Sequence, residues 1–182
     1  PDGTVDAGTL ATDSVVAAKL GTDAVTADAL KSDAITGTDL PAGSVLQVVS
    51  MSTGTPQSST SSTYADTAVT LNITPTLSTS KILALVNVTG CHKNGGAGSG
   101  AYLALQLMRD GVAKLIFESQ GGYTASTAYT SFGACSGTLL DSPSTTSAVT
   151  YKVQMKDLAN VGVVAINQGG SISTMTLMEI AG

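Results

Sequence analysis

Six carboxylates lie beyond residue 41, and they are the residues most suited to acid–base chemistry. A glycoside hydrolase needs two carboxyl groups about 5 to 10 Å apart, one with a raised pKa, in a sugar-binding cleft. The candidates are Asp66, Asp110, Glu118, Asp141, Asp157 and Glu179. Asp110 stands before a glycine and Asp141 before a Ser-Pro pair, so both suit turns. With no Trp and five Tyr to line a sugar cleft, we expect no catalytic residue and no enzyme activity.

A nucleophile beside a base is the second chemistry to consider. The only histidine, His92, directly follows Cys91. Adjacent residues in a strand point to opposite faces, which argues against a Cys-His pair within one chain, and the spacing is poor for zinc. We expect His92 to be a solvated or core-edge residue at the mouth of a loop, with no metal or cofactor. One alternative stays open: a three-fold axis could bring three copies of His92 together around a metal or an anion.

The two cysteines, Cys91 and Cys135, are too few for a disulfide framework. Each falls in a segment that is predicted to be a strand. We therefore expect buried free thiols that act as small hydrophobic side chains. A single bridge between them is the alternative.

The first forty residues repeat with a period of ten, and each repeat has an aliphatic residue at its fifth and tenth places. These residues are Val5, Leu10, Val15, Leu20, Val25, Leu30, Ile35 and Leu40. An α-helix would scatter residues five apart around its cylinder, and a straight strand would place alternate ones on opposite faces. A chain that bends once in every five residues brings all of them to one axis, and the intervening Thr-Asp and Gly-Thr pairs suit such bends.

One chain with two aliphatic side chains in ten residues buries too little surface to offset an ordering cost of about 1–2 kcal/mol per residue. Three chains around a common axis do bury enough. We therefore predict a trimeric stem over residues 1–41, β-helical or a looser spiral, with the aliphatic residues on the axis and the aspartates in water. The alternative is an acidic disordered linker, which would not need a fixed aliphatic period. Pro41 blocks continued pairing, and the period stops there.

The pattern after Pro41 changes to period two, which indicates strands with one buried face. Nine strands are predicted, at 44–50, 68–73, 81–88, 101–109, 112–118, 129–139, 148–156, 161–166 and 173–180. Short strands about ten residues apart are typical of a sandwich or barrel. Asp110-Gly111 predicts a hairpin over 101–118, because both residues tolerate a positive φ. We expect residues 42–182 to form an all-β, antiparallel head domain.

Four long polar loops are predicted between these strands, at 53–63, 89–100, 119–128 and 141–147. Loops of this length at the ends of a sandwich often carry binding sites. The candidate contact residues in or beside them are His92, Lys93, Asn94, Tyr123, Thr124 and Tyr129. A tyrosine on a loop is suited to contact a sugar or a surface protein. The alternative is that both tyrosines only cover the edge of the sandwich.

Charge and hydropathy exclude two classes of partner. The net charge is −5, and the eight basic residues form no run that could neutralise successive phosphates, so we expect no nucleic-acid binding. No stretch approaches 18 consecutive apolar residues, so we expect no membrane insertion.

The repeat units VVAAKL, AVTADAL and AITGTDL resemble repeats in the fibres and baseplate appendages of tailed bacteriophages. The stretches GSVLQVVSMST, LNITPTLSTSKILALVNVTG and YLALQLMRDGVAKL are similar to the head domains attached to such shafts. The resemblance covers essentially the whole chain and brings no active-site residues. It implies a homotrimer with a short β-structured stem and a jelly-roll-like β-sandwich head, comparable in plan to C1q and tumour-necrosis-factor heads.

The function that we expect from this resemblance is structural and adhesive. The chain would be part of a virion, with its N-terminal side against other virion proteins and its head on a host-surface glycan or protein. Two alternatives are a capsid-decorating or collar fibre that binds other virion components, and a tailspike that hydrolyses glycans. A third, a secreted C1q-like module, would normally bring a signal peptide and a collagen-like stem, and neither is visible.

Overall fold

The computed structural model describes residues 15, 16, 18, 20–22, 24–26, 35–95, 100–124 and 126–182. The chain divides into two units, Pro1–Thr36 and Gly37–Gly182. The second unit begins with a 3-10 turn, η3 (Gly37–Asp39). A Cβ added to Gly37 would lie 3.3 Å from Leu46 Cδ1, so this turn packs against the head. The division therefore falls after Thr36, whereas the sequence places it after Pro41.

The predicted stem axis is described only in part, because Val5, Leu10 and Leu30 lie outside the described residues. None of the described residues before Val45 is in a β-strand. The axis residues that are described have exposed side chains in the single chain: Val15 (53 %), Leu20 (45 %), Val25 (53 %), Ile35 (57 %) and Leu40 (39 %). A β-helical or spiral stem stays a prediction.

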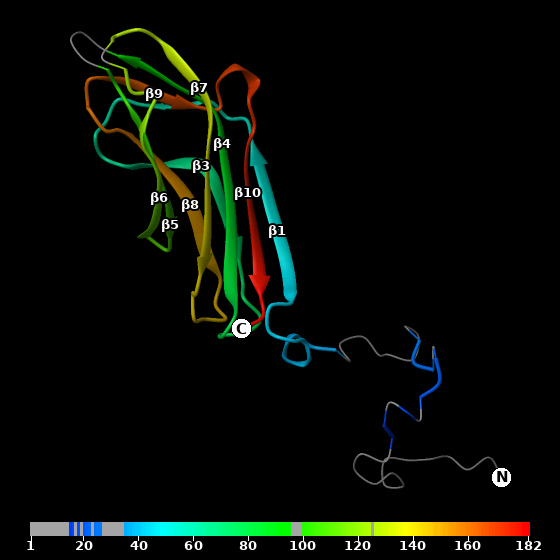
Figure 1. Ribbon diagram of the computed structural model, residues 1–182. Helices are drawn as coiled ribbons and strands as arrows, with labels where there is room; N and C mark the ends of the chain where they lie inside the picture. The colour runs from blue at the N-terminus through cyan, green and yellow to red at the C-terminus, as the bar shows by residue number, and fades with distance from the viewer. Residues whose placement is uncertain are drawn as a thin grey trace, which may run out of the picture. The chain divides into compact units, whose positions relative to one another are not determined.

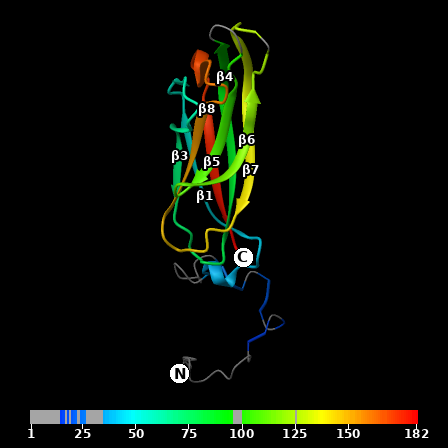
Figure 2. The same cartoon turned by 90° about the vertical axis from the view of Figure 1, so that its left-hand side faces the viewer.

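Two antiparallel sheets form the head, as the sequence predicts (Figure 1). The strands are β1 (Val45–Thr53), β2 (Gln57–Ser59), β3 (Ala65–Ile73), β4 (Lys81–Gly95), β5 (Leu103–Arg109), β6 (Val112–Gly121), β7 (Thr130–Asp141), β8 (Val149–Asp157), β9 (Gly162–Ile166) and β10 (Ser173–Ile180). The six-stranded sheet has the order β1-β10-β4-β9-β2, with β7 also paired to β4. The four-stranded sheet has the order β3-β8-β5-β6 and lies nearer the viewer in Figure 2. All nine predicted strands are present, and β2 is additional.

The core between the sheets follows from the period-two pattern. In β4 the buried residues alternate from Ile82 to Val88, and in β8 every second residue from Val149 to Asp157 is buried. Burying one large aliphatic or aromatic side chain contributes about 1.5–3 kcal/mol relative to leaving it exposed. The buried side chains of β4 and β10 in one sheet and of β5 and β8 in the other form a single apolar cluster. This cluster therefore holds the two sheets together.

The hairpin between β5 and β6 confirms the prediction made from Asp110-Gly111. Both residues have positive φ, 47° and 83°, so the turn has the backbone twist that matches the flanking strands. The Asp110 carboxylate also accepts a hydrogen bond from the backbone N–H of Thr150 at 2.8 Å. This turn is thereby tied to β8 as well.

Both cysteines are free and buried, as predicted, with Cys91 in β4 and Cys135 in β7. The Cys91 thiol lies 3.4 Å from the carbonyl oxygen of Val88. Two causes raise the pKa of the Cys135 thiol well above its usual range. The larger is a hydrogen bond with Cys91, and the next is burial of the thiol. Cys135 is therefore protonated at neutral pH.

Among the described residues, no helix has the length and hydropathy needed to cross a membrane.

Candidate functional site

A hollow of about 390 Å³ lies on the six-stranded sheet, at the end of the sheet away from the start of β1. It forms where β4 changes partner, because β4 pairs with β10 as far as Asn87 and with β9 from His92 onward. The β4–β7 ladder is also irregular at this level. The lining residues are Thr89, Gly90, Tyr129, Ser131, Gly133, Ala134, Gln168, Gly169 and Ser171.

One wall of the hollow is the turn η4 (Gln168–Gly170), which joins β9 to β10. The backbone N–H of Asn167 donates to Thr89 O at 2.8 Å, and the N–H of Thr89 donates to Ser173 Oγ at 3.0 Å. Gly90 has a φ of 60°, and a Cβ at this position would lie 2.5 Å from the nitrogen of Gln168. Only glycine allows this close approach, so Gly90 fixes the place of the Gln168 wall.

Tyr129 and His92 stand together beside the hollow. Their ring centroids are 4.6 Å apart and the rings are tilted by 34°. Tyr129 is 60 % exposed, while His92 is half-buried and its Nδ1 has no hydrogen-bond partner. Burial lowers the pKa of His92 below its usual value, so this ring is uncharged at neutral pH. The tyrosine thus presents an open aromatic surface that is braced by a neutral imidazole.

A second hollow of about 300 Å³ adjoins the first. Its lining residues are Pro56, Gln57, Ser58, His92, Val163, Ala165 and Gln168. Gln168 lines both hollows, so this residue stands between them. His92 lines the second hollow and its ring contacts Tyr129 of the first. The two hollows therefore meet at Gln168 and at the His92–Tyr129 pair, and together they are the candidate site.

The prediction of a loop at 89–100 was wrong over residues 89–95, because β4 continues to Gly95. His92, Lys93 and Asn94 are strand residues: β9 pairs with all three, and β7 pairs with His92 and Lys93 from the other side. Lys93 is fully buried. Its ammonium group donates to Thr124 Oγ1 at 2.6 Å and to the carbonyl oxygen of Ser126 at 2.7 Å. Lys93 therefore anchors the β6–β7 loop from inside and is not available to an external partner.

The other candidate residues are not brought together. Thr124 is half-buried as the acceptor for Lys93, and Asn94 is exposed near the end of β4. Tyr123 is 58 % exposed and packs edge-on against Tyr102, with the ring centroids 5.2 Å apart. Of the six residues chosen from the sequence, only His92 and Tyr129 meet at the hollow.

Thr89 and Gln168 line the site and were missed by the sequence reasoning. Both are common polar residues without a distinctive spacing. The one available signal is the turn composition of residues 167–170, Asn-Gln-Gly-Gly, which marks a tight connection but not a binding wall.

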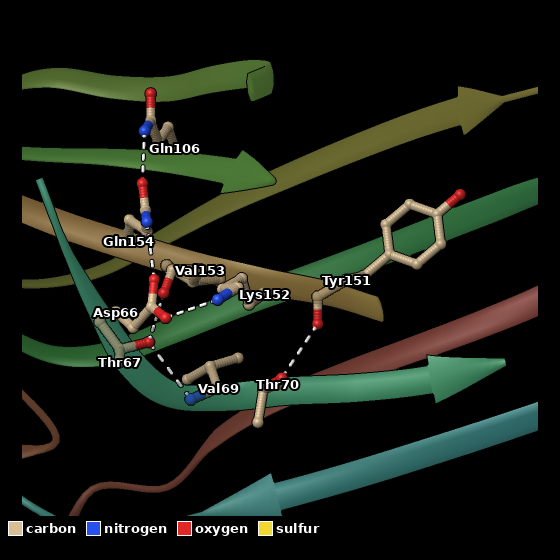
Figure 3. A network of polar contacts seen from close by, with 9 residues as sticks. All are labelled: Asp66, Thr67, Val69, Thr70, Gln106, Tyr151, Lys152, Val153 and Gln154. Carbon is tan, nitrogen blue, oxygen red and sulfur yellow. Dashed lines mark hydrogen bonds and ion pairs between the residues drawn. The ribbon is translucent and has the colours of Figure 1, made fainter. Parts of the chain in front are cut away.

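The outer face of the four-stranded sheet carries a polar ladder instead of a hollow (Figure 3). Gln106 donates to Gln154 at 2.7 Å, Gln154 donates to Asp66 at 2.6 Å, and Lys152 donates to Asp66 at 2.5 Å. The hydrogen bond from Lys152 is the main cause that lowers the pKa of Asp66. These side chains satisfy one another across β5, β8 and β3, while Ile116 of β6, which is paired with Gln106, is 58 % exposed.

The outer face of the six-stranded sheet has the opposite character near Ser44. An apolar row crosses four strands at one level, where Val48 is paired with Met178, Met178 with Leu83, and Leu83 with Leu140. Val48 and Leu140 are 54 % and 53 % exposed. We call these four residues the apolar row. Four residues further along β1, toward the hollow, the same four strands have polar residues paired across the sheet. These are Ser52, Thr174, Asn87 and Ser136.

The six candidate carboxylates all accept hydrogen bonds within the head. Asp141 accepts from Arg109 at 2.5 Å and from the Tyr151 hydroxyl at 2.8 Å. Glu179 is fully buried and accepts from Gln47 at 2.6 Å and from the backbone N–H of Thr76 at 2.7 Å. These contacts give the carboxylates structural roles. In the part of the chain that the structure describes, no group of three His, Cys, Asp or Glu side chains could hold a metal ion.

No protein-family model matches the chain, and no match is found among the curated proteins. The proposed function therefore rests on the geometry described above and on the sequence resemblance.

Proposed function

We propose that the chain is the stem and head of a homotrimeric appendage of a tailed-bacteriophage virion, and that its head binds the host cell surface. The observation that carries this proposal is the division of one sheet face into two parts. The half near Ser44 has the apolar row, and the opposite end has the hollow beside Tyr129. Such a face suits assembly at one end and recognition at the other.

The strand order supports a jelly-roll-like head. The path β1-β10-β4 with β7 faces the path β3-β8-β5-β6, which is the eight-strand, two-sheet plan of that architecture. The strands β2 and β9 then extend the first sheet at the end that carries the hollow.

Trimer formation would cover apolar groups that a single chain leaves in water. The apolar row is one such group, and the exposed aliphatic residues of the repeat region are another. The polar ladder on the other sheet pairs its own polar groups, and the exposed aliphatic residues there, Val112 and Ile116, lie in the edge strand β6. Two further copies of the chain would cover both the apolar row and the repeat region. The two belong to one chain, so a single association would cover them together. An interface with these contacts would be obligate.

Three heads on one stem would convert weak single contacts into useful avidity, because each further contact is intramolecular once the first has formed. The N-terminal side of the stem would then be the part that meets other virion proteins. This arrangement places the host contact on the head and the mechanical connection on the stem.

Binding of the fluorescently labelled full chain to a panel of bacterial strains tests the host-surface role. We expect saturable binding to a subset of strains that excess unlabelled chain displaces. If none of the strains shows saturable binding, the receptor-binding role is contradicted. Release of reducing sugar ends from the bound cells would instead identify a tailspike hydrolase.

A further inference from the structure

The hollow beside Tyr129 combines an open aromatic ring with small polar groups. Tyr129 is 60 % exposed, and Ser131, Gln168 and Ser171 provide hydroxyl and amide groups around it. Gly133 has nothing within 4 Å of where its Cβ would be, so this part of the lining is open. A flat apolar ring next to hydroxyl and amide groups matches a molecule with a C–H face and a rim of hydroxyl groups.

Thr89 adds a polar atom that the protein leaves unsatisfied. Its Oγ1 is buried and has no hydrogen-bond partner, although the residue lines the hollow. An unpaired buried hydroxyl is unfavourable, because it has lost its hydrogen bonds to water. The Thr89 side chain would have to turn toward the hollow for this oxygen to meet a ligand hydroxyl.

The charge of the site selects among polar ligands. Among the described residues, no aspartate, glutamate, lysine or arginine lines either hollow. His92 is kept neutral at pH 7 by burial, and Lys93 points into the head. A carboxylate, sulfate or phosphate on the ligand would therefore lose water without gaining a cation.

We infer that these two adjoining hollows bind a neutral saccharide, with one sugar ring stacked on Tyr129 and its hydroxyl groups near Ser131 and Gln168. The hollow of about 390 Å³ falls within the range of roughly 300–1,000 Å³ for small-molecule sites. The second hollow, of about 300 Å³, shares Gln168 with the first and offers room for a further sugar unit. This inference rests on the proposed function and names the chemical class of the receptor.

Saturation-transfer NMR with the full chain tests this inference. The probes are the methyl glycosides of glucose, galactose, mannose and N-acetylglucosamine, their neutral disaccharides, and the methyl glycoside of glucuronic acid as the anionic comparison. We expect a signal from at least one neutral probe, a stronger signal from its disaccharide, and none from the acid.

The variant Tyr129→Ala should weaken the binding of that neutral probe by about tenfold or more, because the stacking surface is lost. The matched control is Tyr123→Ala, which removes a tyrosine of nearly equal exposure, 58 %, away from the hollow. Both variants should keep the thermal unfolding midpoint of the unmodified chain, since both side chains are mostly exposed. Equal loss in both variants, no neutral-probe signal, or a stronger signal from the acid would overturn the inference.

The same variants in the cell-binding experiment separate this inference from the proposed function. Cell binding that Tyr129→Ala leaves unchanged would overturn the saccharide site and leave the receptor-binding role standing. Saccharide binding that depends on Tyr129, without binding to any strain, would support the site and contradict the host-surface role. Loss of both saccharide binding and cell binding in Tyr129→Ala, but not in Tyr123→Ala, supports the saccharide site and the host-surface role together.

Discussion

The variant Asp157→Ala should lower the free energy of unfolding by at least about 3 kcal/mol. Asp157 is fully buried, and its carboxylate accepts from the backbone N–H groups of Tyr102 at 3.3 Å, Ala159 at 3.1 Å, Val161 at 2.9 Å and Gly162 at 3.0 Å. Hydrogen bonds to an ionised acceptor are stronger than neutral ones. Alanine leaves all four donors without this acceptor in a site closed to water, and it frees the turn between β8 and β9.

Denaturant unfolding at one fixed protein concentration measures this effect, since the stability of an oligomer depends on concentration. The control is Asp66→Ala. This variant also removes a carboxylate, one that accepts hydrogen bonds from Lys152 and Gln154. The Asp66 side chain is 52 % exposed, so we expect a loss of less than about 1 kcal/mol. Losses of equal size in the two variants would contradict the role given to Asp157.

The variant Val48→Asp should convert the chain from a trimer to a monomer. Val48 belongs to the apolar row and is 54 % exposed in the single chain, so a carboxylate is tolerated there in the monomer. In a trimer it would bury three uncompensated charges in an apolar interface, which is strongly unfavourable. Sedimentation velocity should show a single species near 18.1 kDa.

The control for this variant is Val112→Asp. Val112 is a valine of similar exposure, 58 %, in β6 of the four-stranded sheet. It lies outside the apolar row, so this variant should remain trimeric. A Val48→Asp chain that keeps the mass of a trimer would show that the interface lies elsewhere.

The alternation of apolar residues was sufficient to predict the strands of the head, because each strand has one face in a shared core. It failed at β2 (Gln57–Ser59), a short strand of polar residues that is held by pairing with β9. It also failed from Thr89 to Gly95, where glycines suggested a loop. Strand propensity depends on neighbours, and β7 and β9 supply pairing on both sides of this segment.

The candidate site could be predicted only as separate residues. His92 and Tyr129 were chosen by type, but their contact depends on the irregular register between β4 and β7, which no local pattern marks. Gln168 reaches the hollow because Gly90 allows its backbone to pack closely. That approach joins two distant segments, so it could not be derived from either one alone.

The period of five in the repeat region is the strongest sequence signal for assembly, and the apolar row is the strongest structural one. In both, the single chain leaves aliphatic side chains exposed, which the proposed trimer would cover. The proposed function therefore depends first on trimer formation.

The solution mass of the full chain, measured by light scattering after size exclusion, decides whether the trimer forms. We predict a mass near three times 18.1 kDa that does not change on dilution through the micromolar range. A chain that starts at Ser44 would then show whether the stem is required for assembly. A stable monomer of the full chain would contradict the trimer and leave residues 1–41 as a linker.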